Sequence, residues 1–399
     1  MSYNVEEVRS HFPALSSGIA FFDGPGGSQV PRQVGEAIAA AITAPISNRG
    51  TITKSEQNAE AIVNGFRSAV ADLVDGDPAG VVYGRSWTQL TYDFSRNLSK
   101  QWSQGDEIIV SRLDHDSNIR PWIQAAEKVG AVVKFAEFDL ESTELAPEVI
   151  GNLLSDKTKL VAVTGASNVL GTRPNLAAIS KLVHQSSALF YVDGVHLTPH
   201  APVSMREFGA DFYGFSAYKI FGPHCAALVA APELLETIKN DKLRPSTMVV
   251  PERFEFGTLP YELMAGVTAA IDFIADLAPG ASASRRGRIV NSMKVLEEYE
   301  VNLFEELQRG ILALPGVTSY GHAANRTPTL FFNFKGLDSG AVYRHLATKL
   351  VNAPASNFYA LESSLALGLG EQGALRAGLA PYSTQEDVER LISGIAELL

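Results

Sequence analysis

The feature that most constrains the fold is a series of short apolar runs, each leading into a polar or glycine-containing turn. The runs are EIIVSRL near residue 107, KLVAVTG near 159, ALFYVDG near 188, FYGFSA near 212 and AALVAA near 226. Continuous apolar runs of this length are typical of parallel strands that are covered on both faces. The segment NLAAISKLVHQSS, from Asn175, has helical apolar spacing and a good N-cap. Alternation of such segments over roughly residues 60–230 predicts a doubly wound α/β domain.

The pattern changes near Pro279 and Gly280, where a second domain is expected. A long helix is predicted from about Arg288 to Leu312, then a strand in TLFFNF, a helix over 339–350, a strand in ALRAGLA and a closing helix from Thr384. A chain of 399 residues is long for a single core. We therefore expect a large α/β domain over residues 20–279 and a smaller α+β domain made of 1–19 and 280–399.

Charge and cysteine content exclude several functions. The net charge of −11 disfavours a nucleic-acid partner, and we interpret the cluster of Arg285, Arg286 and Arg288 as a solvated helix start or linker. The single cysteine, Cys225, allows neither an intramolecular disulfide nor a cysteine-based metal site, and no metal is predicted. An acidic N-terminus without an apolar segment, and no apolar stretch of about 18 residues, predict a cytoplasmic protein without a membrane partner.

Three successive predicted strands end in polar side chains. Asn168 follows the run near 159, Asp193 and His196 follow the next, and Ser216, Tyr218 and Lys219 follow the third. Ligands of open α/β sheets bind at the carboxyl ends of the strands, so these side chains should meet at one edge. Together they supply an amide, a carboxylate with an imidazole, and an amine.

This set of groups suits pyridoxal 5′-phosphate (PLP). PLP needs a lysine for its Schiff base and a carboxylate that keeps its pyridine nitrogen protonated, so that the ring acts as an electron sink. Lys219 and Asp193 would take these roles, with Asn168 and His196 beside the ring hydroxyl. Once released by substrate, Lys219 would carry the α-proton, which requires a lowered pKa. A nicotinamide enzyme is disfavoured because no GxGxxG joins a first strand to a helix.

The stretch YVDGVHLTPHAPVSMREFGADFYGFSAYKIFGP resembles the core of the class V aminotransferases, which are fold type I PLP enzymes, and within them the cysteine desulfurase-like branch. The resemblance extends over nearly the whole chain. It implies a fold type I PLP-dependent transferase fold, an amino acid substrate, and a homodimer with shared active sites.

Several site residues follow from this resemblance alone. His115, in SRLDHDSNIRPW, would stack on the pyridine ring, and Arg376, in LRAGLAPYST, would bind the substrate carboxylate. Gly257 and Thr258, in RFEFGT, would reach the phosphate of the neighbouring subunit. The sequence NRG, with Asn48 and Arg49, resembles an active-site loop that contacts substrate.

The chain departs from the family pattern at three places. The phosphate loop reads YGRSWTQL, where Ser86 and the backbone amide of Trp87 can still bind phosphate at a helix N-terminus. Tyr218 stands where desulfurases usually have a histidine. The loop NAPASNFYALESSLALGLGEQ lacks the cysteine that attacks substrate sulfur in desulfurases, and we interpret Cys225 as a buried core thiol.

We therefore expect an enzyme other than an ordinary cysteine desulfurase. The first hypothesis is a β-elimination of the C–S lyase type through a Lys219 Schiff base (an aldimine) without an enzyme persulfide. The second is an aminotransferase that passes the amino group to a keto acid, and the third is a non-catalytic partner protein with a PLP fold. The loop over 352–372, with Gly26, Gly27 and residues 48–52, is expected to line the substrate pocket and to favour a modest neutral side chain.

Overall fold

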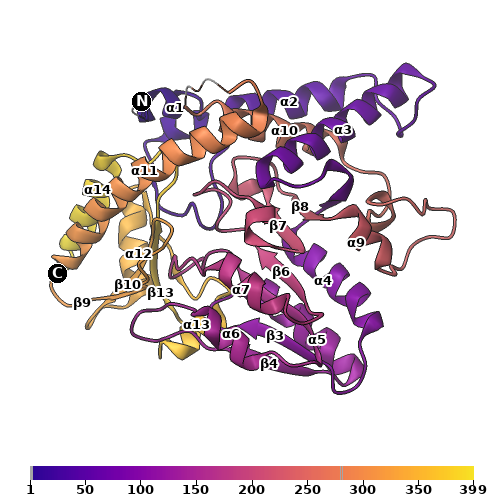
Figure 1. The fold of residues 1–399 in the computed structure, drawn as a ribbon. Helices are drawn as coiled ribbons and strands as arrows, with labels where there is room; N and C mark the ends of the chain where they lie inside the picture. The colour runs from indigo at the N-terminus through magenta and orange to yellow at the C-terminus, as the bar shows by residue number, and fades with distance from the viewer. Residues whose placement is uncertain (1–2, 279, 281) are drawn as a thin grey trace.

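The computed structural model describes residues 3–278, 280 and 282–399, and it consists of a large sheet domain and a smaller domain (Figure 1). The large sheet has seven strands in the order β2-β8-β7-β6-β5-β3-β4. Their bounds are β2 Val81–Gly84, β3 Glu107–Ser111, β4 Val132–Ala136, β5 Thr158–Thr164, β6 Leu189–Asp193, β7 Phe212–Ser216 and β8 Ala226–Ala230. The predicted doubly wound, mostly parallel α/β domain is confirmed.

One predicted strand runs in the unexpected direction. Strand β8, the run near 226, pairs antiparallel with both β7 and β2, whereas β3, β4, β5, β6 and β7 pair in parallel. The prediction of a parallel strand there was wrong, because a fully apolar run indicates burial on both faces but carries no information on strand direction.

Helices cover both faces of the large sheet, and this explains why its strands lack alternation. Ile109 and Phe190 pack into one core together with residues of α3, α7 and α10, while their neighbours Ile108 and Tyr191 pack into a second core with residues of α4 and α5. The helices of this domain are α2 Arg32–Thr43, α3 Lys54–Val74, α4 Trp87–Leu98, α5 Arg120–Val129, α6 Pro147–Leu153, α7 Leu176–Val183, α8 Met205–Phe208, α9 Pro232–Thr237 and α10 Tyr261–Ala275.

The smaller domain packs α11, α12 and α14 against an antiparallel sheet of order β12-β13-β10-β9. Figure 1 shows α11 descending obliquely from the top of the molecule to this domain on the left, where the C-terminus lies. The bounds are α1 Val5–Ser10, α11 Arg285–Leu312, β9 Val317–Tyr320, β10 Thr329–Phe334, α12 Ser339–Thr348, β12 Ala355–Ser356, α13 Leu361–Ala366, β13 Ala374–Gly378 and α14 Gln385–Ala396. The predicted α+β character is confirmed, and Thr384 forms the expected N-cap of α14.

The predicted division into domains stays a prediction. Its boundary residue Pro279 lies outside the described residues. At the other boundary, strand β1 (Ala20–Phe21) pairs in parallel with β11 (Val351–Asn352), which follows α12 of the smaller domain. Residues 20 and 21 therefore lie against the domain to which the prediction did not assign them.

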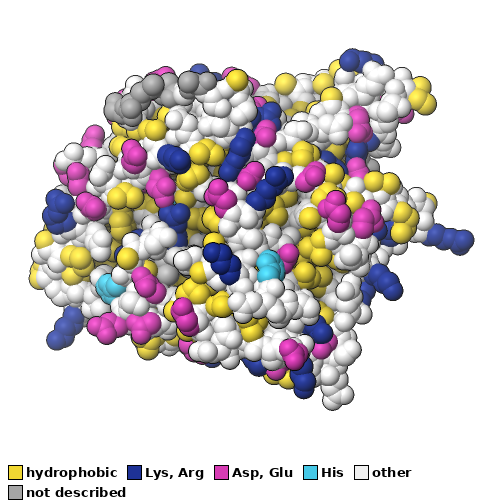
Figure 2. Space-filling view, viewed as in Figure 1, with side chains coloured by type: hydrophobic (Ala, Val, Ile, Leu, Met, Phe, Trp, Pro, Cys, Tyr) yellow, Lys and Arg dark blue, Asp and Glu magenta, His cyan; other side chains and the backbone are white. Residues whose placement is uncertain are grey.

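The arginine cluster at the start of α11 is more than a solvated helix start. Arg285 forms an ion pair with Asp272, and Arg286 donates to the backbone carbonyls of Asp72 and Leu73 at the end of α3. These contacts join α11 to α3 and α10. Figure 2 shows cationic and anionic side chains interspersed on one face of the molecule. Among the described residues no helix has the length and apolar character needed to span a bilayer, and the cytoplasmic location stays a prediction.

Candidate active site

The carboxyl ends of β5, β6 and β7 lie side by side and define the site. Asp193, the last residue of β6, is in register with Thr164 of β5 and Gly214 of β7. A deep cavity of about 70 Å³ opens there and continues into an outer chamber of about 610 Å³. The deep part is lined by Ser86, Trp87, Thr88, His115, Ser117, Thr164, Ala166, Asn168, Asp193, Val195, His196, Ser216, Tyr218 and Lys219. All the predicted strand-end side chains therefore meet.

Lys219 lies in the short 3₁₀ turn η5 (Ala217–Lys219) that follows β7. Its side chain is buried, and its Nζ donates to the backbone carbonyl of Pro25. Burial, reinforced by the positive charge of Arg376, lowers the pKa of the Lys219 amine to about 7. A substantial fraction of this amine is therefore neutral and nucleophilic at neutral pH.

Asp193 is held by an indole donor that the sequence did not reveal. Its Oδ2 accepts from Trp87 Nε1 at 2.7 Å, and its Oδ1 accepts from the backbone N–H of Val195 at 2.9 Å. Burial raises the pKa of the Asp193 carboxyl to about 6, against the opposing effect of these hydrogen bonds. The carboxylate is thus fixed in position and still predominantly ionised at neutral pH.

Two further polar side chains in the deep cavity have atoms without partners. His196 Nε2 lies 3.0 Å from the hydroxyls of Thr327 and Thr329, whereas its Nδ1 is buried without a hydrogen bond. Asn168 donates through Nδ2 to the carbonyl of Phe358 at 3.0 Å, and its Oδ1 has no partner. Buried polar atoms are normally satisfied, so these two atoms point to a polar ligand in the cavity.

His115 precedes the turn η4 (Asp116–Asn118), where its Nδ1 accepts the backbone N–H of Ser117 at 3.1 Å. That bond places the proton of the neutral ring on Nε2. Burial, with the nearby charges of Lys219 and Arg376, lowers the pKa of His115 to about 3. The imidazole is therefore neutral and can cover a flat ring without adding charge.

Arg376 extends from β13 into the outer chamber. Its guanidinium donates to the carbonyl of Asn168 at 3.0 Å and lies 3.7 Å from the centroid of the Phe358 ring. Burial lowers the pKa of Arg376 to about 9, so it stays charged at neutral pH. A buried guanidinium with its Nε unpartnered is suited to binding a carboxylate.

The N-terminus of α4 faces the deep cavity. Ser86 caps this helix by accepting the N–H of Gln89, and the first-turn N–H groups have no partners within the helix. Such an end binds phosphate. Beside it, the Tyr218 ring stacks on His224 with centroids 5.0 Å apart, a contact that the sequence analysis missed. Tyr218 also interacts with Ser216, and burial raises the pKa of its phenol.

These groups fit PLP. The helix end suits its phosphate, Asp193 its pyridine nitrogen, the unpartnered atoms of His196 and Asn168 its ring hydroxyl, and the buried amine of Lys219 its aldehyde carbon. In the described part of the chain, no group of three or more histidine, cysteine, aspartate or glutamate side chains is arranged to hold a metal ion.

Four predicted residues are not brought to this cavity within one chain. Arg49 forms ion pairs with Glu60 and Glu252, and Asn48 is exposed on the same loop. Gly257 is exposed with a left-handed φ of 77°, and Thr258 lines a separate cavity of about 450 Å³. The roles of all four residues stay predictions. For Gly257 and Thr258 the predicted role is to contact the cofactor phosphate of a second subunit.

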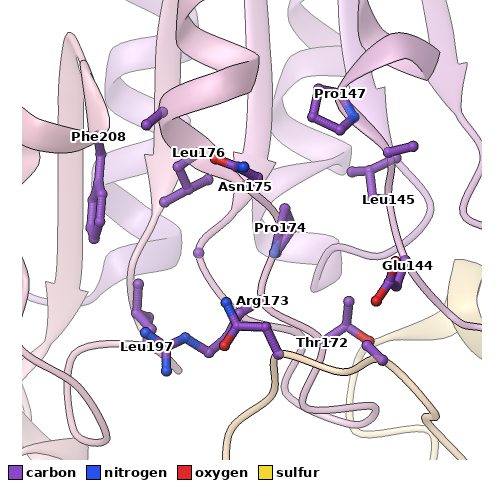
Figure 3. Close-up of a pocket in the computed structure, with 15 residues that line it drawn as sticks. Glu144, Leu145, Pro147, Thr172, Arg173, Pro174, Asn175, Leu176, Leu197 and Phe208 are labelled. Carbon is purple, nitrogen blue, oxygen red and sulfur yellow. The ribbon is translucent and has the colours of Figure 1, made fainter.

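A cavity elsewhere in the large domain lacks such chemistry. Figure 3 shows this space, of about 520 Å³, between the segment from Glu144 to Pro147 and the start of α7. Its cationic side chain, Arg173, is already paired with Glu297, and Glu144 accepts a backbone N–H from Ala324. The candidate active site is therefore the cavity that contains Lys219.

The fold and this set of groups define a fold type I PLP-dependent enzyme. The family model for class-V aminotransferases matches residues 20–391, and the chain belongs to that family. An uncharacterised protein of Mycobacterium tuberculosis is 34% identical, with 100% of each chain covered. An aminotransferase-like protein of Gibberella zeae is 31% identical, covering 100% of this chain and 99% of that protein. The cysteine desulfurase CsdA of Escherichia coli has a similar structure, with a TM-score of 0.88, 25% identity and 100% of both chains covered.

Proposed function

We propose that this protein is a PLP-dependent lyase that eliminates a sulfur-linked β-substituent from an α-amino acid without forming a persulfide on the enzyme. The supporting observation is the contrast between two nucleophiles. Lys219 lines the deep cavity with a pKa of about 7, whereas Cys225, the only cysteine in the sequence, is buried in the core with its pKa raised to about 12.

Each residue of the site would have a separate role in such an elimination. PLP, when bound, supplies a protonated ring that draws electrons from the substrate α carbon. Asp193 holds the ring nitrogen in its protonated form, and Arg376 binds the substrate carboxylate. Lys219 Nζ accepts the α-proton and can then return it to the departing sulfur. The neutral His115 ring covers the site and excludes water from one side.

The test is product analysis with purified holoenzyme. Cysteine and cysteine thioethers should give pyruvate and ammonia without an added keto acid, and Lys219→Ala should give none. Mass spectrometry of the protein after turnover should find no persulfide on Cys225. Persulfide on the enzyme, or turnover by Lys219→Ala, would contradict the proposal.

An aminotransferase is the second candidate, favoured by the 31% identity to an aminotransferase-like protein. Transamination would use the same amine, carboxylate and guanidinium, namely Lys219, Asp193 and Arg376. The two reactions are therefore distinguished by their products and not by their residues. Conversion of the cofactor to its amine form by an amino acid, reversed by a keto acid, would support transamination over elimination.

A homodimer is the proposed assembly. Large apolar side chains are exposed on the loops that carry the four residues outside the cavity: Ile52 is 87% exposed, Met248 64% and Phe256 51%. The ion pair between Arg49 and Glu252 joins these loops. Exposed apolar groups gathered near predicted partner-contacting residues are what an isologous interface would cover.

A further inference from the structure

The outer chamber extends beyond Lys219 and Arg376 and is large for an amino acid as small as cysteine. Its volume is about 610 Å³, against about 70 Å³ for the deep cavity around Asp193. Lys219 lines both spaces, whereas Arg376 lines only the outer one. A substrate whose carboxylate binds Arg376 would therefore project its side chain into the outer chamber.

Beyond the three groups already assigned to cofactor and substrate carboxylate, the described residues that line the chamber include no unpaired ionic side chain for the substrate side chain to contact. Apart from Lys219, His115 and Arg376, the ionic groups are Asp116 and Arg120, which pair with each other at 3.0 Å. Arg120 also lies 3.7 Å from Glu362. A charged substrate side chain would have to compete with these existing ion pairs, whereas a neutral one would not.

Aromatic rings line much of the rest of the chamber, and two of them belong to a strained turn. Tyr92, Tyr218, Phe358 and Tyr359 all line it. Phe358 and Tyr359 are consecutive residues with φ of 52° and 59°, a region that bulky side chains rarely occupy. Such conformations persist only where surrounding contacts fix them.

Two hydrogen bonds fix this turn in the lining of the chamber. The carbonyl of Phe358 accepts from Asn168 Nδ2 at 3.0 Å, and the carbonyl of Tyr359 accepts from the backbone N–H of Asp116 at 2.7 Å. The turn directs the Phe358 ring onto Arg376 and places the Tyr359 ring 5.5 Å from that of His115. Tyr359 is nevertheless 73% exposed, so a face of its ring is free to contact a ligand.

We propose that the substrate is an α-amino acid with a bulky, neutral, aromatic side chain, in place of the modest neutral side chain expected from the sequence, and that Tyr359 determines this specificity. Combined with the proposed lyase reaction, on which this step rests, the substrate class is a cysteine thioether with an aryl or benzyl group on sulfur. The Cα–H and Cβ–S bonds break, and the sulfur leaves with its electron pair and takes a proton. One water is consumed, so that the thioether yields a thiol, pyruvate and ammonium with no external oxidant or reductant.

Binding tests the substrate class independently of elimination. Holoenzyme is titrated with L-phenylalanine, L-alanine and L-aspartate while the cofactor absorbance is followed. Phenylalanine should bind at least about tenfold more tightly than alanine, because the free energy gained by burying a phenyl group corresponds to at least about that factor in Kd. Tyr359→Ala should remove most of this preference and leave alanine binding unchanged. Tyr343→Ala serves as the control, because Tyr343 is also an exposed tyrosine but lies on α12, outside the chamber lining. This variant should behave like the unaltered protein.

Equal binding of alanine and phenylalanine, tighter binding of aspartate, or an unchanged preference in Tyr359→Ala would overturn the assignment. A comparison of S-benzyl-L-cysteine and S-methyl-L-cysteine as substrates distinguishes failure of the lyase reaction from failure of the substrate class. A preference for phenylalanine with no pyruvate from either thioether would refute the lyase reaction and keep the substrate class. Pyruvate from both with equal kcat/KM would support the lyase reaction and refute the aromatic class.

Discussion

At the scale of single residues, the site is characterised by the burial of ionisable groups. Burial lowers the pKa of Lys219 to about 7 and that of His115 to about 3, while it raises the pKa of Asp193 to about 6. Each shift favours the neutral form. The result at neutral pH is an ionised carboxylate beside a neutral imidazole and an amine near its midpoint, which is the combination that a Schiff-base lysine requires.

The lowered pKa of Lys219 predicts how cofactor capture depends on pH. Because the neutral amine is the reactive form, the rate at which apoprotein captures PLP should rise about tenfold from pH 6 to pH 8 and then level off. Stopped-flow absorbance measures this rate, with Nα-acetyl-lysine as the control, whose rate should continue to rise. A rate that climbs steadily beyond pH 9 would show that the pKa of Lys219 is not lowered.

The hydrogen bond from Trp87 Nε1 to Asp193 Oδ2 should contribute to cofactor affinity. Trp87→Phe keeps an aromatic ring against Tyr191 and removes the donor. A hydrogen bond to a charged group contributes about 1.5–3 kcal/mol, so the Kd for PLP should rise at least about tenfold. Fluorescence titration measures the Kd, and Trp102→Phe, a half-buried tryptophan outside the cavity, should leave it unchanged. Equal Kd values for the two variants would show that the bond does not matter.

At the scale of elements, the sheet positions the site through close contact between β7 and the first turn of α4. A Cβ atom on Gly214 of β7 would lie 1.8 Å from Cζ3 of Trp87. The indole therefore occupies the space beside a strand residue that has no side chain. The same ring then reaches Asp193 at the end of β6, so three elements hold the carboxylate.

Gly214→Ala tests this packing. The added methyl group should displace Trp87, lower the free energy of unfolding by about 1–3 kcal/mol and weaken PLP binding. Gly35→Ala is the matched control because nothing lies within 4 Å of its added Cβ in α2, and it should stabilise the protein by up to about 1 kcal/mol. Chemical denaturation measures both changes, and a Gly214→Ala protein as stable as the parent would contradict the packing.

The sequence predicted elements better than it predicted contacts between them. Apolar runs in the sequence located β3, β5, β6 and β7. Polar residues that follow these runs, such as Asp193 and Lys219, could be predicted to lie together because the ends of neighbouring strands meet wherever a parallel sheet forms. The direction of β8 and the indole bond to Asp193 were missed. These depend on residues far apart in the chain, such as Trp87 and Asp193, and no local pattern records their pairing.

At the scale of the whole molecule, the smaller domain completes the site from outside the large sheet. Arg376 on β13 and the turn at Phe358 both contact Asn168 of the large domain. Substrate would therefore bind between the two parts. Thr258, predicted with Gly257 to act across subunits, lines a cavity other than the one that contains this chain's own Lys219, and the role of both residues across subunits stays a prediction.

The proposed dimer predicts that a charge in the exposed apolar loops will separate subunits. Phe256→Glu should shift the protein toward monomer, because a carboxylate would be buried in the interface, and should weaken PLP binding. Analytical ultracentrifugation follows the assembly. Leu140→Glu, at an exposed apolar residue outside these loops, should leave it unchanged, and a dimer that tolerates Phe256→Glu would argue against this interface.

Above all, we propose that Lys219 anchors the cofactor. Borohydride reduction of the holoenzyme, followed by proteolysis and mass spectrometry of the peptides, measures this directly. We predict that the reduced PLP adduct is found on the peptide that contains Lys219, in stoichiometric amount. An adduct on a different lysine, or none on a protein shown to contain PLP, would contradict the claim.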